Sequence, residues 1–90
     1  MITEYRISDH AQSEMLRRHI SEDLVAQVLA APEQIENIRA GRDVYQARID
    51  MGIPAKTYLI RVFVDVDREP PVIVTVYRTR KVGKYWRDSE

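Results

Sequence analysis

Hydrophobic positions recur at helical spacing in the first third of the chain. The clearer stripe predicts a helix over residues 22–31, which begins after a capping Ser21 and ends before Pro32. A thinner stripe predicts an earlier helix over residues 10–19, with residues 8 and 9 as its capping candidates. The apolar positions of the two helices are Ala11, Met15, Leu16, Leu24, Val25, Val28 and Leu29.

After Pro32 the pattern alternates between apolar and polar positions, which is typical of strands. The alternation is strictest over residues 56–66. Further strands are predicted over residues 3–7, 34–39, 44–50 and 72–79, and a short helical turn over residues 81–87. Two helices followed by a run of strands predict an α+β fold of order β-α-α-β-β-β-β, with both helices on one face of an antiparallel sheet.

The same alternation divides side chains between the two faces of the sheet. Even-numbered positions of the last two strands are predicted to face the helices, and odd-numbered positions to face away. The inward positions of the last strand would be Val72, Val74 and Val76. The outer face would collect guanidinium, hydroxyl and phenol groups from Arg48, Arg61, Thr75 and Tyr77. We call this outer surface the open face. Its composition is more typical of a binding surface than of a second hydrophobic core.

Length and composition narrow the classes of function. Ninety residues predict one domain that spans positions 1–90. The chain has no cysteine, which excludes disulfides and thiolate metal sites and fits a cytoplasmic location. It has no secretory h-region at its start and no apolar run of about 20 residues, so we expect no membrane partner. Two histidines nine positions apart and three scattered glycines predict neither a metal site nor a phosphate loop, and no cofactor is expected.

Charge is neutral in total but unevenly distributed. Residues 1–40 hold four cations and seven acids, whereas residues 70–90 hold five cations and two acids. The segment TVYRTRKVGKYWR interleaves cations with three aromatic rings, a combination that suits phosphates and unpaired bases. We therefore predict RNA as a partner, although Tyr85 and Trp86 could instead cover an edge of the core. The predicted RNA-binding residues are Arg48, Arg61, Arg78, Arg80, Lys81, Lys84, Tyr85 and Trp86.

One flank of the first predicted helix carries groups suited to proton transfer. His10, Glu14 and Arg17 or Arg18 follow each other at spacings of three and four. Imidazole transfers protons near neutral pH and guanidinium matches phosphate, so the set suits metal-independent RNA cleavage. The alternative is that His10 only caps or packs the helix.

Short motifs at both ends resemble those of a known group of proteins. The first is His10-Ala11, Met15, Arg18 and Ile20-Ser21, and the second is residues 75–79 with Lys81 and residues 84–86. Together they resemble a family of small bacterial domains of unknown function that is similar to RelE-like and BrnT-like toxins, in the group of ribonuclease folds that includes barnase. Two positions depart from the family pattern, since Glu14 stands where a cation is common and His19 where glycine is common.

The resemblance implies a RelE-like fold, metal-independent ribonuclease activity and control by an antitoxin protein. Carried over by motif position, the catalytic candidates are His10, Arg18, Thr75 and Tyr77, with Lys81 as a weaker addition. Two alternatives stay open at this point: a non-catalytic module that binds RNA or a protein, and a homodimer whose aromatic tail forms the interface.

Overall fold

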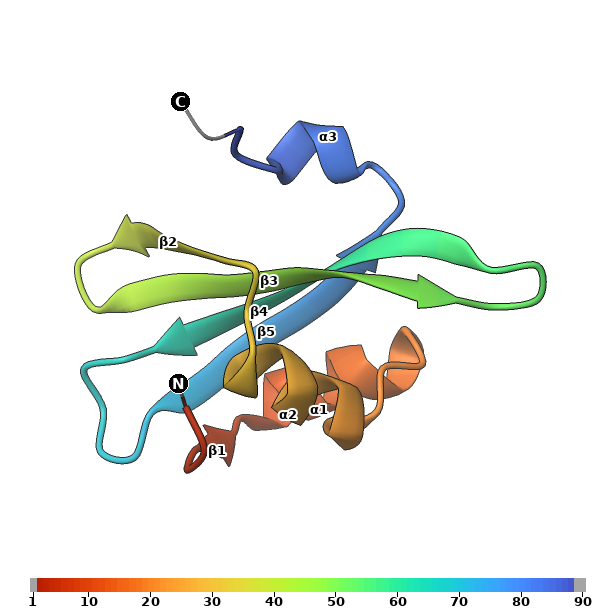
Figure 1. Cartoon of the computed structure of the whole chain (residues 1–90). Coiled ribbons are helices and arrows are strands. Elements are labelled where there is room, and N and C mark those ends of the chain that lie inside the picture. Colours follow the sequence, from red (N-terminus) through yellow and green to blue (C-terminus); the bar gives the residue numbers. More distant parts are fainter. Residues whose placement is uncertain (1, 89–90) are drawn as a thin grey trace.

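Five strands form one mixed sheet, and two helices near the N-terminus cover one of its faces (Figure 1). The computed structural model describes residues 2–88. Along the chain the elements are β1 (Arg6–Ile7), α1 (Asp9–Arg17), α2 (Glu22–Ala30), β2 (Gln34–Arg39), β3 (Arg42–Met51), β4 (Lys56–Asp65), β5 (Val72–Thr79) and α3 (Val82–Tyr85). The strand order is β1-β5-β4-β3-β2.

The predicted α+β class and element order are confirmed, but the sheet is not purely antiparallel. The short β1 pairs in parallel with β5, with Arg6 opposite Val72. All other neighbouring strands are antiparallel. The parallel pair arises because α1 and α2 lie between β1 and the rest of the sheet in sequence, so the chain leaves β1 without a hairpin turn.

Side-chain caps and backbone turns set the ends of the elements. The Ser8 and Ser21 hydroxyls each accept a hydrogen bond from a backbone amide three residues later, at 3.1 Å. Helix α1 therefore begins at Asp9, one residue earlier than predicted, and its end is followed by His19 with a left-handed φ of 56°. Gly41, at φ 81°, allows a tight turn, so β3 begins two residues before the predicted start.

The main core lies between the helices and the sheet. It is built from apolar side chains of α1, α2, the segment between them and the three central strands: Ala11, Met15, Ile20, Val25, Val28, Leu29, Ala47, Ile60, Val62, Val64, Ile73 and Val76. Leu16 was predicted on the apolar stripe, but 80% of it is exposed. The neighbouring positions of α1 explain this, because Ala11 and Met15 already meet the sheet and Leu16 lies about 100° further round the helix.

A β-bulge changes the face of the first half of β5. The pairing shifts by one residue, so that two pairs flank it: Phe63 with Thr75, and Val64 with Ile73. Val74 is the extra residue, and Ile73 takes the position in the core. The predictions that Val72 and Val74 face the helices are therefore wrong, as is the outward prediction for Ile73. Beyond the bulge the predicted alternation holds, with Val76 inward and Tyr77 outward.

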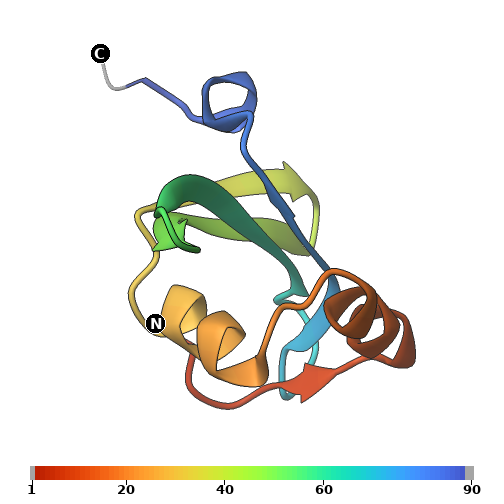
Figure 2. The same cartoon turned by 90° about the vertical axis from the view of Figure 1, so that its right-hand side faces the viewer.

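The face opposite the helices is partly covered. Figure 2 shows α3 on the side of the sheet away from α1 and α2. Val44 and Leu59 alternate with the inward residues of β3 and β4, yet both are fully buried. The open face thus has a small second layer formed by the residues that follow β5, which we call the tail (residues 80–88). None of the helices within residues 2–88 is long and apolar enough to cross a membrane.

Two leucines test the helical packing. Leu29→Ala removes a fully buried side chain of α2 and is expected to lower the free energy of unfolding by about 2–5 kcal/mol, since a cavity remains. Leu16→Ala removes an exposed side chain and is expected to change it by less than about 0.5 kcal/mol. Urea unfolding measures both. Equal losses in the two variants would contradict this description of the core.

Candidate functional site

A row of polar side chains crosses the open face from β2 to β5. Gln34, Gln46, Arg61 and Tyr77 lie opposite one another on four successive strands. The Gln46 amide nitrogen donates to the Gln34 amide oxygen at 2.8 Å. Arg61 donates from Nε to the Gln46 amide oxygen at 2.9 Å and from Nη1 to the Tyr77 hydroxyl at 2.8 Å. We call these four residues the cross-strand ladder.

Arg61 is a buried cation with neutral partners. Only 7% of it is exposed. None of the ion pairs within residues 2–88 includes it. Its guanidinium carbon lies 4.3 Å from the ring centre of Tyr85 and 5.2 Å from that of Phe63. Neutral acceptors and ring faces offset part of the cost of burying a charge, and an anion would offset more of it. This position therefore suits binding of a phosphate or carboxylate.

The tail is attached to the ladder through its backbone. The Gln46 amide nitrogen donates to the carbonyl of Tyr85 at 3.3 Å. Gln34 accepts from the backbone nitrogen of Arg87 at 3.1 Å and donates to its carbonyl at 2.5 Å. These bonds hold the Tyr85 ring over Arg61. The guanidinium is therefore buried although α3, the helix on this face, is short.

Two tyrosine hydroxyls meet beside Arg61. The rings of Tyr77 and Tyr85 are edge-to-face, with centres 5.9 Å apart, and the two phenols influence each other's pKa. Burial raises the pKa of the Tyr77 phenol, and its hydrogen bond with Tyr85 adds to this. The hydrogen bond from Tyr77 lowers the pKa of the Tyr85 phenol, with further lowering by Lys84 and Arg61. The two phenols therefore differ in acidity although they are neighbours.

Helix α1 supplies a second guanidinium to this place, but not an imidazole. The Arg18 guanidinium carbon lies 5.8 Å from the Tyr77 ring centre. His10 is exposed, and it precedes Arg18 by eight residues, which is about 12 Å along the helix axis. Glu14 binds the guanidinium groups of Arg17 and Arg18, and these hydrogen bonds hold the pKa of its carboxyl below the usual value. Glu14 is thus engaged by the arginines rather than by His10.

The remaining predicted residues fall into three places. Thr75 lies on the open face opposite Phe63. Arg78 lies opposite Ile60 and over the Tyr58 ring, at 5.1 Å, on the helical side of the sheet. The residues of the tail and its support stand on or near the open face: Arg48, Arg80, Lys81, Lys84, Tyr85 and Trp86. The structure thus brings together Arg18, Arg61, Tyr77 and Tyr85, and separates Arg78 from them.

The sequence interpretation did not select Gln34 and Gln46 as site residues. Gln46 is fully buried and Gln34 is partly buried. A signal was available, because Gln46 lies between valine, tyrosine and alanine in a strand, two positions before Arg48, which was predicted on the same face as Arg61. A glutamine at such a position needs partners for both ends of its amide.

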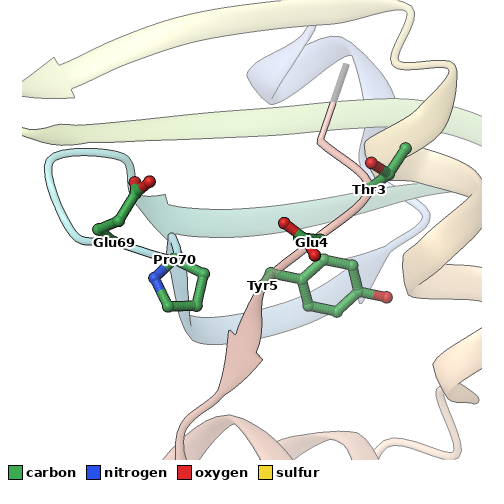
Figure 3. Close-up of a pocket in the computed structure, with 5 residues that line it drawn as sticks. All are labelled: Thr3, Glu4, Tyr5, Glu69 and Pro70. Atoms are coloured by element: carbon green, nitrogen blue, oxygen red, sulfur yellow. The ribbon is translucent and has the colours of Figure 1, made fainter.

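Two cavities among the described residues lie away from the ladder. The larger, of about 550 Å³, is lined by Thr3, Glu4, Tyr5, Glu69 and Pro70, between the N-terminal segment and the loop that precedes β5 (Figure 3). Its two carboxylates and lack of a cation make it unsuited to an anion. A second cavity, of about 270 Å³, lies between α1 and the start of α2 and is lined by Met15, Leu16 and Ile20 among others. The candidate site is therefore a surface on the sheet.

Metal chemistry has no prepared ligand set in the part of the chain that the structure describes. Within residues 2–88, no group of three or more His, Asp and Glu side chains could hold a metal ion. The chemistry available at the ladder is therefore that of phenols and guanidinium groups.

A family model described as "Domain of unknown function (DUF4258)" matches residues 7–78. The chain belongs to this family. The matched stretch contains the whole cross-strand ladder and Arg18, and it ends two residues before the tail begins. No curated protein and no solved structure matched the chain.

The ladder predicts an unequal response to two glutamine substitutions. Gln46→Leu leaves the buried Arg61 Nε without its acceptor and is expected to lower the free energy of unfolding by about 1–3 kcal/mol or more. Gln27→Leu alters an exposed position of α2 and should change it by less than about 0.5 kcal/mol. Urea unfolding compares them. A Gln46→Leu protein as stable as the control would show that these hydrogen bonds contribute nothing.

The tyrosine pair predicts an order of ionisation. As pH rises, Tyr85 should lose its proton before Tyr77. Tyr77→Phe removes the main cause of the lowered pKa of Tyr85, so Tyr85 should then ionise at higher pH. Tyrosinate absorbance follows these steps, and Tyr85→Phe identifies the first one by removing it. An unchanged first step in Tyr77→Phe would contradict the coupling.

Proposed function

We propose that this protein is a metal-independent endoribonuclease that cleaves single-stranded RNA at the β5 edge of the open face. The observation that carries the proposal is the pairing of two phenols of unequal pKa beside a buried guanidinium that has no carboxylate partner within residues 2–88. Neighbouring groups with oppositely shifted pKa values are a frequent arrangement for an acid and a base.

The proposed reaction is attack of the RNA 2′-oxygen on the adjacent phosphorus. The Tyr85 phenolate accepts the proton of the 2′-hydroxyl, and the bond from phosphorus to the 5′-oxygen breaks. Tyr77 donates its proton to the departing 5′-oxygen. The products are a 2′,3′-cyclic phosphate and a 5′-hydroxyl end, and the proton returns from Tyr85 to Tyr77 between the two neighbouring phenols.

The arginines stabilise the negative charge of the transition state in this proposal. Arg61 already donates to the Tyr77 hydroxyl, and the Arg18 guanidinium carbon lies 5.8 Å from the centre of the same ring. A guanidinium matches two phosphoryl oxygens geometrically, and a fixed cation needs no reorganisation during the reaction. The assignments of His10 and Thr75 that came from the resemblance stay predictions.

The resemblance to RelE-like and BrnT-like toxins supports the same reaction class. On that basis we propose that the chain acts as the toxin of a toxin–antitoxin pair, with an antitoxin protein as its partner. Expression of this chain alone would then arrest bacterial growth, and a neighbouring gene would encode the antitoxin.

Cleavage of single-stranded RNA in the presence of a chelator tests the proposal. Tyr77→Phe removes only the hydroxyl and is expected to slow cleavage about 10²–10⁴-fold while RNA binding changes little. Tyr58→Phe alters a tyrosine on the helical side of the sheet and should leave the rate unchanged. The rate should rise with pH as Tyr85 ionises and fall as Tyr77 does, because the base must be deprotonated and the acid protonated.

Other outcomes would overturn the assignment in different ways. RNA binding without any cleavage would select the non-catalytic binding module. Cleavage that is lost in His10→Ala but retained in Tyr77→Phe would move the proton transfer to α1.

A further inference from the structure

Trp86 is held in a fixed orientation close to the proposed reaction site. Its backbone nitrogen donates to the carbonyl of Val82 at 2.9 Å. The preceding carbonyl accepts from Gln46, and the following residue, Arg87, is bound at both its nitrogen and its carbonyl by Gln34. An aromatic residue near a chain end is here fixed by hydrogen bonds on both sides rather than by burial in the core.

One face of the indole rests on a guanidinium that is itself fixed. The Arg48 guanidinium carbon lies 4.1 Å from the Trp86 ring centre. Glu33 holds Arg48 with both carboxylate oxygens, at 3.1 Å to Nε and 3.0 Å to Nη2, and accepts from its backbone nitrogen at 2.8 Å. These contacts restrain the guanidinium, so the ring has a rigid, planar support.

The Trp86 ring is not buried in the main core. Trp86 does not belong to the apolar cluster between helices and sheet, and it is only partly buried. It directly follows Tyr85, whose ring covers Arg61. A planar aromatic group is thus presented one residue away from the proposed general base, on a segment that also carries Lys81 and Lys84.

We infer that Trp86 is a nucleobase subsite, on which the unpaired base of a nucleotide adjoining the scissile phosphate stacks. This inference rests on the proposed function for the identity of the ligand as RNA. The three layers would be the Arg48 guanidinium, the indole and the base. Such a subsite requires single-stranded RNA, because a base within a duplex has no free ring face, and it accepts any base because every base has one.

The tail cations have a different role in this arrangement. Lys84 Nζ lies 5.3 Å from the Tyr85 ring centre and would attract phosphates. Phosphate contacts depend on salt through counterion release, whereas stacking on a ring depends on it little. Base stacking and phosphate attraction can therefore be separated by experiment.

The intrinsic fluorescence of the protein provides the direct test, because Trp86 is the only tryptophan. The probe is a 2′-O-methylated single-stranded oligonucleotide, which lacks the 2′-hydroxyl nucleophile and so is not cleaved. It should quench the fluorescence of the intact protein. An abasic strand of the same length keeps the phosphates and should not quench, nor should the same sequence in a duplex. Equal quenching by the abasic strand would overturn the inference.

Binding of a labelled probe compares the variants. Trp86→Ala should weaken binding about 5- to 150-fold without changing its salt dependence, while Trp86→Phe should keep part of the affinity. Lys84→Ala should instead reduce the slope of log affinity against log salt by about 0.7. Unchanged affinity in Trp86→Ala would overturn the inference and leave the cleavage mechanism intact. Quenching without any cleavage of ordinary RNA would overturn the mechanism and retain the subsite.

Discussion

The burial of the Arg61 guanidinium is the constraint on which the open face depends. Burying a charge in a nearly dry position costs free energy unless nearby groups offset it. At Arg61 an amide, a phenol and aromatic rings offset part of this cost. Gln46 is consequently fixed, because its oxygen serves Arg61 and its nitrogen serves Gln34 and the tail.

The two faces of the sheet are built in different ways. The helical side is an ordinary apolar core, in which apolar side chains of α1 and α2 meet three strands. On the open side the buried apolar residues include Val44 and Leu59, and the tail is attached mainly through side-chain bonds to its backbone. The helical side provides stability. The open side arranges buried polar groups, and the stability of the helical side offsets the free-energy cost of burying them.

The chemistry proposed for the site follows from the groups that surround Arg61 and the two tyrosines. Because no acid of the described residues forms an ion pair with Arg61, we propose that the guanidinium attracts an incoming phosphate. The phenol that it contacts is buried and weakly acidic, while its neighbour lies near cations and is more acidic. A difference in environment between two identical groups is what separates an acid from a base. The Arg48–Trp86 stack extends the same surface toward β2 and gives it a place for a base.

The sequence by itself determined the helices and strands and, for most strand side chains, the face of the sheet on which they lie. Serine caps, the proline after α2 and period-two alternation are local signals, so α2, β2, β4 and β5 appear within one residue of their predicted ends. It also placed Arg48, Arg61 and Tyr77 on one face. Only the tertiary structure decided what depends on pairing between distant segments. The bulge at Val74, the parallel β1, the burial of Arg61 under Tyr85 and the use of Gln34 to hold Arg87 arise from contacts between strands and tail. Alternation along one strand carries no information about its partner's register, and so could not reveal them.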